Sequence, residues 1–285
     1  MGKFKLLERN IIKTWVEAHI AAIGSGDLLA LMAGTASDMQ LVFSRETVVG
    51  QEQLMQFLEQ IGQKWDGFSI YVRRLLIDCE QSVAGLEWVC RGVENGSGQC
   101  QQLLGSAALD FDANRQLTQC KIYFDMDRSG QVGSLDEPWP HERWSPCPNG
   151  GEPPTRTQSE TLIHTYAAAW SSDDAEKVGA LLHNGVHLCP PWTYREGKTA
   201  VKAIVHYHFE NFEDTQMTPH RIIYDVSQPC FGVCQQTFAC TNPKTGLRGA
   251  DSDYAFFEIC EGKLRYWRNY FDTQRSVQEA YKDGI

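Results

Sequence analysis

The chain has 285 residues, of which 42% are hydrophobic and 22% charged, and its formal net charge is -10. This length is sufficient for two domains of ordinary size, each with its own core. The negative charge and the lack of any Lys/Arg-rich run argue against a nucleic acid or an anionic membrane as the main partner. A small, partly apolar organic molecule, or a protein, is therefore the expected partner.

The first part of the chain is predicted to contain helices followed by strands. Residues 1–27 carry charges among their apolar positions, which is typical of an amphipathic helix and not of a signal peptide or membrane span, so a cytoplasmic location is expected. Apolar spacing over 11–32 predicts a long helix and a short one, with a break at 24–27. A strand or hairpin at 39–49, a helix after Gly50, and strands at 68–78, 82–93, 103–111 and 116–124 follow.

The second part of the chain repeats this order after an irregular stretch. Residues 128–160 hold six of the eleven prolines and show no periodicity, which indicates a linker. From 161 the pattern predicts two helices, a strand at 187–189, a helix over 198–212, and strands near 221–226, 230–240, 250–259 and 264–271. The predicted domains are 1–128 and 161–285, joined by a linker at 129–160.

The stretch 249–272 is predicted to form two strands joined by a two-residue turn at Glu261-Gly262. Subtracting 147 gives 102–125, and both stretches end in Tyr-Phe-Asp. The sequence therefore predicts a tandem duplication. Because each unit is rich first in helices and then in strands, the expected class is α+β, with a curved antiparallel sheet around the helices.

This order and the shared Tyr-Phe-Asp ending resemble the nuclear-transport-factor-2-like superfamily, in particular its SnoaL-like polyketide cyclase, ketosteroid isomerase and scytalone dehydratase branch. The resemblance implies two cone-shaped units, each a curved antiparallel sheet wrapped around about three helices, with a ligand pocket between sheet and helices. It also implies that the two units pack as an internal pseudo-dimer. Members of the superfamily include isomerases, cyclases, dehydratases, epoxide hydrolases and non-catalytic binders, so the fold does not choose a reaction.

The predicted hairpin assigns side chains to the pocket. A two-residue turn sets Tyr254 opposite Asn269 and Phe256 opposite Trp267, and the resemblance turns these residues inward. Tyr254 then aligns with the oxyanion-hole aspartate of ketosteroid isomerases, and Asn269 with the last-strand catalytic residue of polyketide cyclases. A slip of one residue would exchange the faces and make Asp253 and Arg268 the pocket groups.

A histidine on the third helix of the second unit is the expected proton carrier. His208 lies on the apolar face of the helix at 198–212, and its near-neutral pKa would suit a base or an acid. A core histidine bonded to a backbone carbonyl explains the pattern equally well. The carboxylate base that ketosteroid isomerases place after the first strand is missing here, since Leu188 and Cys189 occupy that position.

The first copy has apolar residues where the second has these polar groups. At the offset of 147, His208 corresponds to Ile61, Tyr254 to Ala107, Asn269 to Ile122 and Trp267 to Cys120. Buried polar groups cost free energy unless they are paired, so their presence only in the second copy favours a site there. The first copy is expected to have an apolar or degenerate pocket.

Four further aromatic residues are candidates for binding a substrate. Tyr166 and Trp170 lie four apart on one face of the first helix of the second unit, where Tyr166 is a candidate catalytic donor and Trp170 a cavity wall. Trp192 and Tyr194 follow the Pro190-Pro191 turn and are expected at the mouth. Core packing, or surface packing for the second pair, explains the same residues without a function.

No metal or cofactor is expected. The ten cysteines lie mostly in apolar or alternating runs, which favours buried reduced thiols, and Cys230 and Cys234 lack zinc-ligand spacing. The predicted function is cofactor-free cyclisation, dehydration or isomerisation in the second unit. His208 would move the proton, and Tyr254, Asn269 and Tyr166 would donate hydrogen bonds. The alternative is a non-catalytic binder of a lipid or pigment, or a scaffold.

Overall fold

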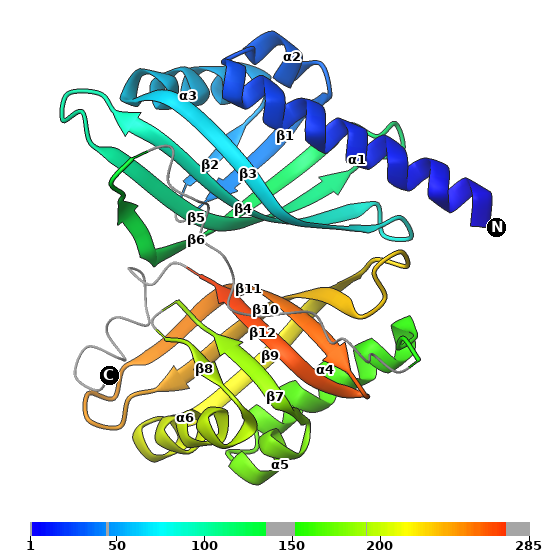
Figure 1. Ribbon diagram of the computed structural model, residues 1–285, viewed down its shortest axis with the longest axis vertical. Coiled ribbons are helices and arrows are strands. Elements are labelled where there is room, and N and C mark those ends of the chain that lie inside the picture. The colour runs from blue at the N-terminus through cyan, green and yellow to red at the C-terminus, as the bar shows by residue number, and fades with distance from the viewer. Residues whose placement is uncertain (1, 44–45, 135–151, 192, 272–285) are drawn as a thin grey trace. The chain divides into compact units, whose positions relative to one another are not determined.

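The computed structural model divides the chain into two compact units, Met1–His141 and Glu142–Ile285, which are called unit 1 and unit 2. It describes the backbone of all residues except 1, 44–45, 135–151, 192 and 272–285, and no side chains are described for 2–7 and 126–128. Figure 1 shows that each unit has one curved sheet with helices packed on it. The predicted α+β class with two sheet-and-helix units is confirmed.

Unit 1 consists of α1 (Gly2–Ser25), α2 (Leu28–Met32), β1 (Thr35–Phe43), β2 (Glu46–Val49), α3 (Gln51–Lys64), β3 (Trp65–Asp78), β4 (Val83–Glu94), β5 (Cys100–Phe111) and β6 (Leu117–Gln131). Unit 2 consists of α4 (Arg156–Trp170), α5 (Ala175–Ala180), β7 (Leu182–Cys189), β8 (Arg195–Glu196), α6 (Lys198–Asn211), β9 (Glu213–Tyr224), β10 (Phe231–Thr241), β11 (Arg248–Cys260) and β12 (Lys263–Tyr270). Helix α4 begins inside the predicted linker.

The two sheets have the same strand order, β2-β1-β6-β5-β4-β3 and β8-β7-β12-β11-β10-β9. The prediction of purely antiparallel sheets is wrong, because β1 runs parallel to β6 and β7 runs parallel to β12. The first long strand of each unit lies beside the last one. A long excursion through helix α3 or α6 and four further strands separates the two, and such a connection permits parallel pairing.

Glycines begin the third helix of each unit. Gly50 and Gly197 are the N-cap residues of α3 and α6, with φ of 82° and 85°, a region that favours glycine. Helix α4 begins differently, with a capping box in which Thr155 accepts a hydrogen bond from the Gln158 backbone and Gln158 bonds back to Thr155. These local signals fix where the helices that cover each sheet begin.

Each unit has its own apolar core between helices and sheet. In unit 2 the fully buried side chains include Ile163 of α4, Val178 of α5, Val205 of α6 and Leu264 of β12. Unit 1 has an equivalent cluster that includes Ile12 and Val16 of α1. Burial of this apolar surface is the main force that holds the helices against the sheets.

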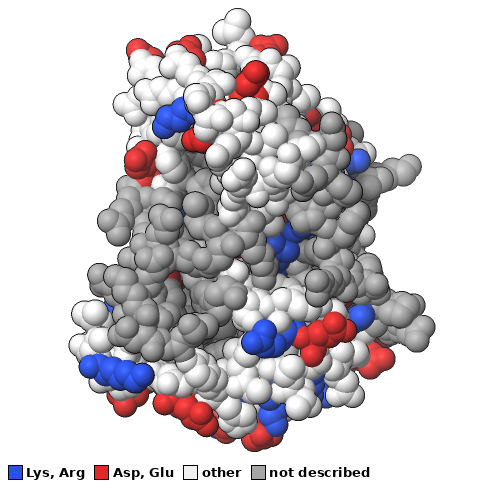
Figure 2. Space-filling model, turned by 60° about the vertical axis from the view of Figure 1, so that its left-hand side comes forward, with Lys and Arg blue, Asp and Glu red and all other residues white. Residues whose placement is uncertain are grey.

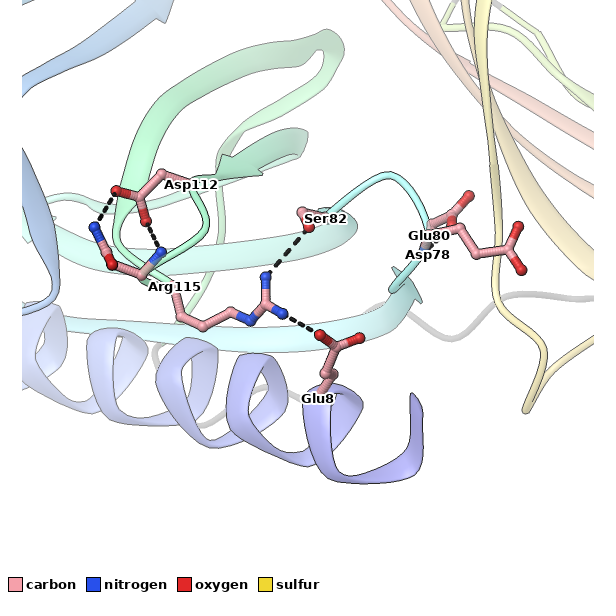
Figure 3. A network of polar contacts seen from close by, with 7 residues as sticks. Glu8, Asp78, Glu80, Ser82, Asp112 and Arg115 are labelled. Atoms are coloured by element: carbon pink, nitrogen blue, oxygen red, sulfur yellow. Dashed lines mark hydrogen bonds and ion pairs between the residues drawn. The ribbon is translucent and has the colours of Figure 1, made fainter. Parts of the chain in front are cut away.

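A polar network fixes α1 of unit 1 to two strand connections (Figure 3). Arg115, in the turn between β5 and β6, forms an ion pair with Glu8 of α1 and donates a hydrogen bond of 3.3 Å to Ser82 Oγ. Asp112 accepts hydrogen bonds from the backbone N–H groups of Asn114 and Gln116 in the same turn. The network positions the long helix and has no counterpart among the residues that line the cavity of unit 2.

Candidate active site

Unit 2 encloses a cavity of about 640 Å³ between its helices and the concave face of its sheet. Helices α4 and α6 supply one wall, and β7 and β9 to β12 supply the other. Most of the lining is apolar and aromatic. The polar side chains that line it include those of Arg195, Gln236, Asp251, Asp253 and Asn269. A mostly apolar cavity with a few converging polar groups is typical of a small-molecule site.

The register of the β11–β12 hairpin decides which side chains reach this cavity. The predicted turn is confirmed, since Glu261 and Gly262 both have positive φ and Ile259 pairs with Leu264. A register shift follows between Glu258 and Ile259, so that Ala255, and not Tyr254, pairs with Asn269. The shift exchanges the two faces of β11 but leaves those of β12 as predicted.

The inward orientation predicted for Tyr254 and Phe256 is therefore wrong. Both side chains are fully buried on the other face of β11, where their rings make an edge contact with centroids 5.8 Å apart. Trp267 and Asn269 of β12 do line the cavity, and Asp253 takes the position expected for Tyr254. Arg268, the other residue of the predicted alternative, lies over the Tyr270 ring at 5.0 Å and is not part of the lining.

Asp253 is the most constrained polar group in the cavity. Its side chain is 1% exposed. Gln236 Nε2 donates a hydrogen bond of 2.7 Å to Asp253 Oδ2, and Asn269 Nδ2 donates to the same oxygen. Oδ1 accepts no side-chain hydrogen bond from the described part of the chain. One carboxylate oxygen is thus held in place by two amides, while the other has no side-chain donor.

Burial raises the pKa of Asp253 to about 7, because a carboxylate loses its hydration in this apolar site. The hydrogen bonds from Gln236 and Asn269 oppose this shift, and the nearby Asp251 carboxylate, also in the lining, adds to it. Near neutral pH both protonation states of Asp253 are populated. A general acid or base works best with such a pKa.

Tyr166 and Trp170 of α4 form part of the wall opposite Asp253. Burial raises the pKa of the Tyr166 phenol far above its usual value, so the hydroxyl keeps its proton, and a hydrogen bond with the Trp170 side chain opposes the shift in part. Indole N–H is only a donor, so the phenol O–H remains free to donate to a bound molecule. The Tyr166 and Trp267 ring centroids lie 5.0 Å apart.

His208 lies in the cavity wall but in an apolar setting. Its Nε2 is hydrogen-bonded to Thr215 Oγ1 at 3.0 Å, and four aromatic rings surround it, those of Trp170, Phe209, Phe212 and Phe238. Burial lowers the pKa of His208 to about 4, so the expectation of a near-neutral pKa is wrong. The imidazole is neutral at pH 7 and holds no cation in the site.

The two aromatic residues expected at the mouth are not part of the described lining. Tyr194 turns its hydroxyl to His187 Nδ1, 2.6 Å away, instead of to the cavity. Trp192 lies outside the described residues. The exposed Arg195 and the half-exposed Tyr207 take their place at the open side of the cavity.

Residues 163–267 match the sequence profile of the SnoaL-like domain family. Unit 2 is a SnoaL-like domain. No curated protein matches the chain significantly. Among the solved structures with a similar fold are three bacterial proteins. An epoxide hydrolase of Mycobacterium tuberculosis is 18% identical and covers 45% of this chain and 93% of its own, with a TM-score of 0.39. A putative polyketide cyclase of Xanthomonas campestris is 23% identical and covers 42% of this chain and 93% of its own, with a TM-score of 0.37. A putative isomerase of Bacillus subtilis is 15% identical and covers 44% of this chain and 94% of its own, with a TM-score of 0.41.

Four polar cavity residues of the SnoaL-like domain were not predicted from the sequence or were left as alternatives: Arg195, Gln236, Asp251 and Asp253. The signal that could have found Asp251 and Asp253 is their alternation with Ser252 just before the mostly apolar run from Tyr254 to Cys260. Two acidic side chains on one face of a buried strand are costly unless they have a function. Gln236 gives no such signal, because it becomes part of the site only through pairing of β10 with β11.

The described residues offer one group with metal-ligand chemistry: His183 of β7, Cys260 at the end of β11, and Glu261 in the turn that follows. The Cys260 sulfur is in a disulfide, so it is not available as a thiolate ligand. The prediction of a reduced thiol is therefore wrong for Cys260, whereas Cys189, Cys234 and Cys240 are buried free thiols.

Figure 2 shows Lys, Arg, Asp and Glu side chains interspersed among the described residues of the face in view. Among the described helices, none is both long and apolar enough to cross a bilayer.

Proposed function

We propose that unit 2 is an enzyme that performs cofactor-free acid/base chemistry on a small, partly apolar molecule with a carbonyl or hydroxyl group. The reaction is a cyclisation, a dehydration or an isomerisation, and Asp253 moves the proton. The observation that carries this proposal is the buried carboxylate of Asp253, with a pKa near 7, in the wall of an apolar cavity. Families with SnoaL-like domains include polyketide cyclases and isomerases.

In the proposed mechanism, ionised Asp253 takes a proton from the carbon next to the substrate carbonyl. The hydrogen bonds from Gln236 and Asn269 hold the carboxylate in one orientation throughout. Tyr166, which keeps its proton, donates to the oxygen on which negative charge develops, a contribution that a dry cavity strengthens. Protonated Asp253 then returns the proton to another atom of the substrate, which completes an isomerisation or drives the loss of a hydroxyl as water.

Proton transfer can be tested before the natural substrate is known. In D₂O, wild-type protein should exchange the α-hydrogens of cyclic and polyketide-like ketones for deuterium, as read by mass spectrometry. Asp253→Asn should slow the exchange by about 10²- to 10⁴-fold. Asp214→Asn is the matched control, because Asp214 is an exposed aspartate of unit 2 outside the cavity lining, and its positive φ suits asparagine.

The outcome also separates the enzyme from a non-catalytic binder, which the mostly apolar lining would also suit. Ketones that raise the melting temperature but show neither exchange nor product in wild-type protein would contradict the enzyme and favour the binder. Equal exchange rates in wild-type protein and Asp253→Asn would contradict the role of Asp253.

A further inference from the structure

The charged groups of the cavity in unit 2 are separated along its depth. Two carboxylates, Asp251 and Asp253, lie on its inner wall and are 7% and 1% exposed. The exposed Arg195 lines the open side. His208, which also lines the cavity, is kept neutral by burial. Within the described lining, the mouth is therefore positive and the inner wall is acidic.

Arg195 is held in position by uncharged groups. Its Nη1 donates to Thr193 Oγ1 at 2.6 Å and to the Tyr194 carbonyl oxygen at 2.9 Å. Within the described part of the chain, no carboxylate forms an ion pair with Arg195, although the protein carries an excess of acidic residues. Nε and Nη2 make no hydrogen bond to those residues and remain available as a fork of donors, which matches a carboxylate or sulfonate.

Two further features favour an anion at this end of the cavity. Helix α6 begins at Lys198, shortly after Arg195 in the chain, and the positive end of its macrodipole adds to the potential there. In contrast, Asp251 and Asp253 repel an anion from the inner wall. A molecule with one acidic end is thus attracted to the mouth in one orientation only.

We infer that the substrate of unit 2 is an amphipathic acid: an apolar, aromatic or alicyclic body with one carboxylate or similar anionic group, which Arg195 binds at the mouth. This orientation places the apolar body and its reacting carbonyl or hydroxyl group beside Asp253. The inference rests on the proposed function, since it names the substrate class of the same site. Arg195 is a specificity-determining residue in this arrangement and takes no part in proton transfer.

A matched pair of fluorescent probes tests the inference without knowledge of the substrate. 8-Anilinonaphthalene-1-sulfonate carries an anionic group on an aromatic body, and N-phenyl-1-naphthylamine has nearly the same body without the charge. Arg195→Gln should weaken binding of the sulfonate by about 5- to 10-fold, as expected for a partly exposed charge-assisted hydrogen bond, and leave the neutral probe within twofold. Added salt should weaken sulfonate binding in wild-type protein more than in Arg195→Gln.

Two control variants complete the experiment. Arg248→Gln removes an exposed arginine of unit 2 that donates hydrogen bonds to Asp214 and Thr241 outside the cavity lining. This variant should bind both probes with unchanged affinity. Ala203→Trp fills part of the cavity from α6 and should weaken both probes, which shows that they bind inside. Arg195→Lys keeps the charge but loses the fork, and it should recover part of the sulfonate affinity.

The possible failures are distinguishable. If Arg195→Gln binds the sulfonate as well as wild-type protein does, while Ala203→Trp still weakens both probes, the inference about Arg195 is overturned and the proposal for Asp253 stands. If Arg248→Gln weakens the sulfonate as much as Arg195→Gln does, the effect is one of net charge and the inference is again overturned. If Ala203→Trp weakens neither probe, the probes do not bind inside the cavity and the inference of an amphipathic acid is overturned, whereas the proposal for Asp253 is decided by the deuterium exchange.

Discussion

Units 1 and 2 place different side chains at equivalent positions of the same sheet. In unit 2, Asp253 of β11 pairs with Gln236 of β10. The equivalent pair in unit 1 is Gly105 of β5 with Trp88 of β4. The equivalence follows from the last hairpins, because Ala255 pairs with Asn269 in unit 2 as Ala107 pairs with Ile122 in unit 1. Glycine and an indole thus replace a carboxylate and an amide.

The indole of Trp88 occupies the volume above Gly105. A Cβ atom at Gly105 would lie 2.5 Å from Trp88 Cζ2, so no larger residue fits while the ring keeps this position. Residues of α1 differ in the same sense. Trp15 Nε1 donates to the Gly34 carbonyl oxygen, and His19 bonds to the backbone oxygens of Trp15 and Leu31. The polar atoms of these aromatic rings are thus bonded to the backbone in unit 1, whereas Tyr166 and Trp170 of unit 2 line a cavity.

The comparison teaches that the same fold can hold an indole over its sheet, as in unit 1, or a cavity with a buried carboxylate, as in unit 2. In unit 1 the Trp88 indole fills the space over Gly105, and the ring nitrogens of Trp15 and His19 are bonded to the backbone, which stabilises the fold. In unit 2 the buried carboxylate of Asp253 opposes stability, as is common where a site serves function. The following predictions test this contrast.

The largest effect on binding should come from moving the unit 1 pair into unit 2. Asp253→Gly combined with Gln236→Trp should fill the cavity with an indole and weaken binding of N-phenyl-1-naphthylamine by about 100-fold or more, equivalent to about 2.8 kcal/mol. Fluorescence titration measures the loss, and circular dichroism checks the fold. Asp253→Gly alone is the control, and its affinity for the probe should stay within tenfold of that of wild-type protein because the cavity remains open. Probe binding by the double variant at the wild-type level would contradict the comparison.

Removing the charge of Asp253 should stabilise unit 2 at alkaline pH. The pKa of Asp253 is about 7 in the folded protein and near 3.8 in the unfolded chain. At a pH below both pKa values, Asp253 is protonated in the folded and in the unfolded protein. As pH rises from about 4 to about 7, the unfolded chain releases this proton and the folded protein keeps it, so the free energy of unfolding falls; above about 7 the loss is constant.

Asp253→Asn abolishes this loss. Relative to wild-type protein, the variant should gain up to about 4 kcal/mol between pH 4 and pH 8. Urea unfolding of the full chain at several pH values measures the difference, and any effect of the amide on packing is independent of pH. Asp214→Asn is the control. A difference between variant and wild-type protein that does not change with pH would contradict the buried, protonated carboxylate.

Much of this contrast could be predicted from the sequence, because it depends on local signals. The glycines that begin α3 and α6, the apolar spacing of the helices and the Glu261-Gly262 turn all identify their elements correctly. The presence of polar residues in the second unit and apolar ones in the first was also visible at Asn269 and Ile122. Such features need no knowledge of distant contacts.

The residue to which proton transfer is assigned in the proposed function could not be predicted in the same way. It depends on which strand of the hairpin absorbs one extra residue, and the shift near Glu258 and Ile259 moves Asp253 into the cavity and Tyr254 out of it. Nothing in the sequence around the turn marks this irregularity. The pKa of His208 was also missed, since it follows from four aromatic rings that come from three different elements and the residue after α6.

Opening the interior of unit 1 should cost stability. Trp88→Ala removes an indole that packs over Gly105 and makes an edge contact with Phe124, with centroids 5.9 Å apart. The expected loss is about 3 kcal/mol, the lower end for a large aromatic side chain because Trp88 is only partly buried. Hydrogen exchange of peptides from β4 and β5 should locate the loss in unit 1. Leu29→Ala is the control, since Leu29 is 76% exposed, and an equally small effect in both variants would contradict the filled interior.

The smallest effect concerns His208, whose counterpart after Gly50 in unit 1 is Ile61, a side chain that does not titrate. The pKa of His208 is about 4 in the folded protein against 6.5 in the unfolded chain, so stability is lost as pH falls from about 6.5 towards 4. By pH 5 the loss should reach about 2 kcal/mol. His208→Phe, which fits the surrounding rings, should remove this dependence, whereas the exposed His206→Gln should keep it. Because Asp253 moves the proton in the proposed mechanism, His208→Phe should also retain deuterium exchange within about tenfold. An exchange rate that falls by about 100-fold or more would indicate that His208 moves the proton, and it would contradict the assignment to Asp253.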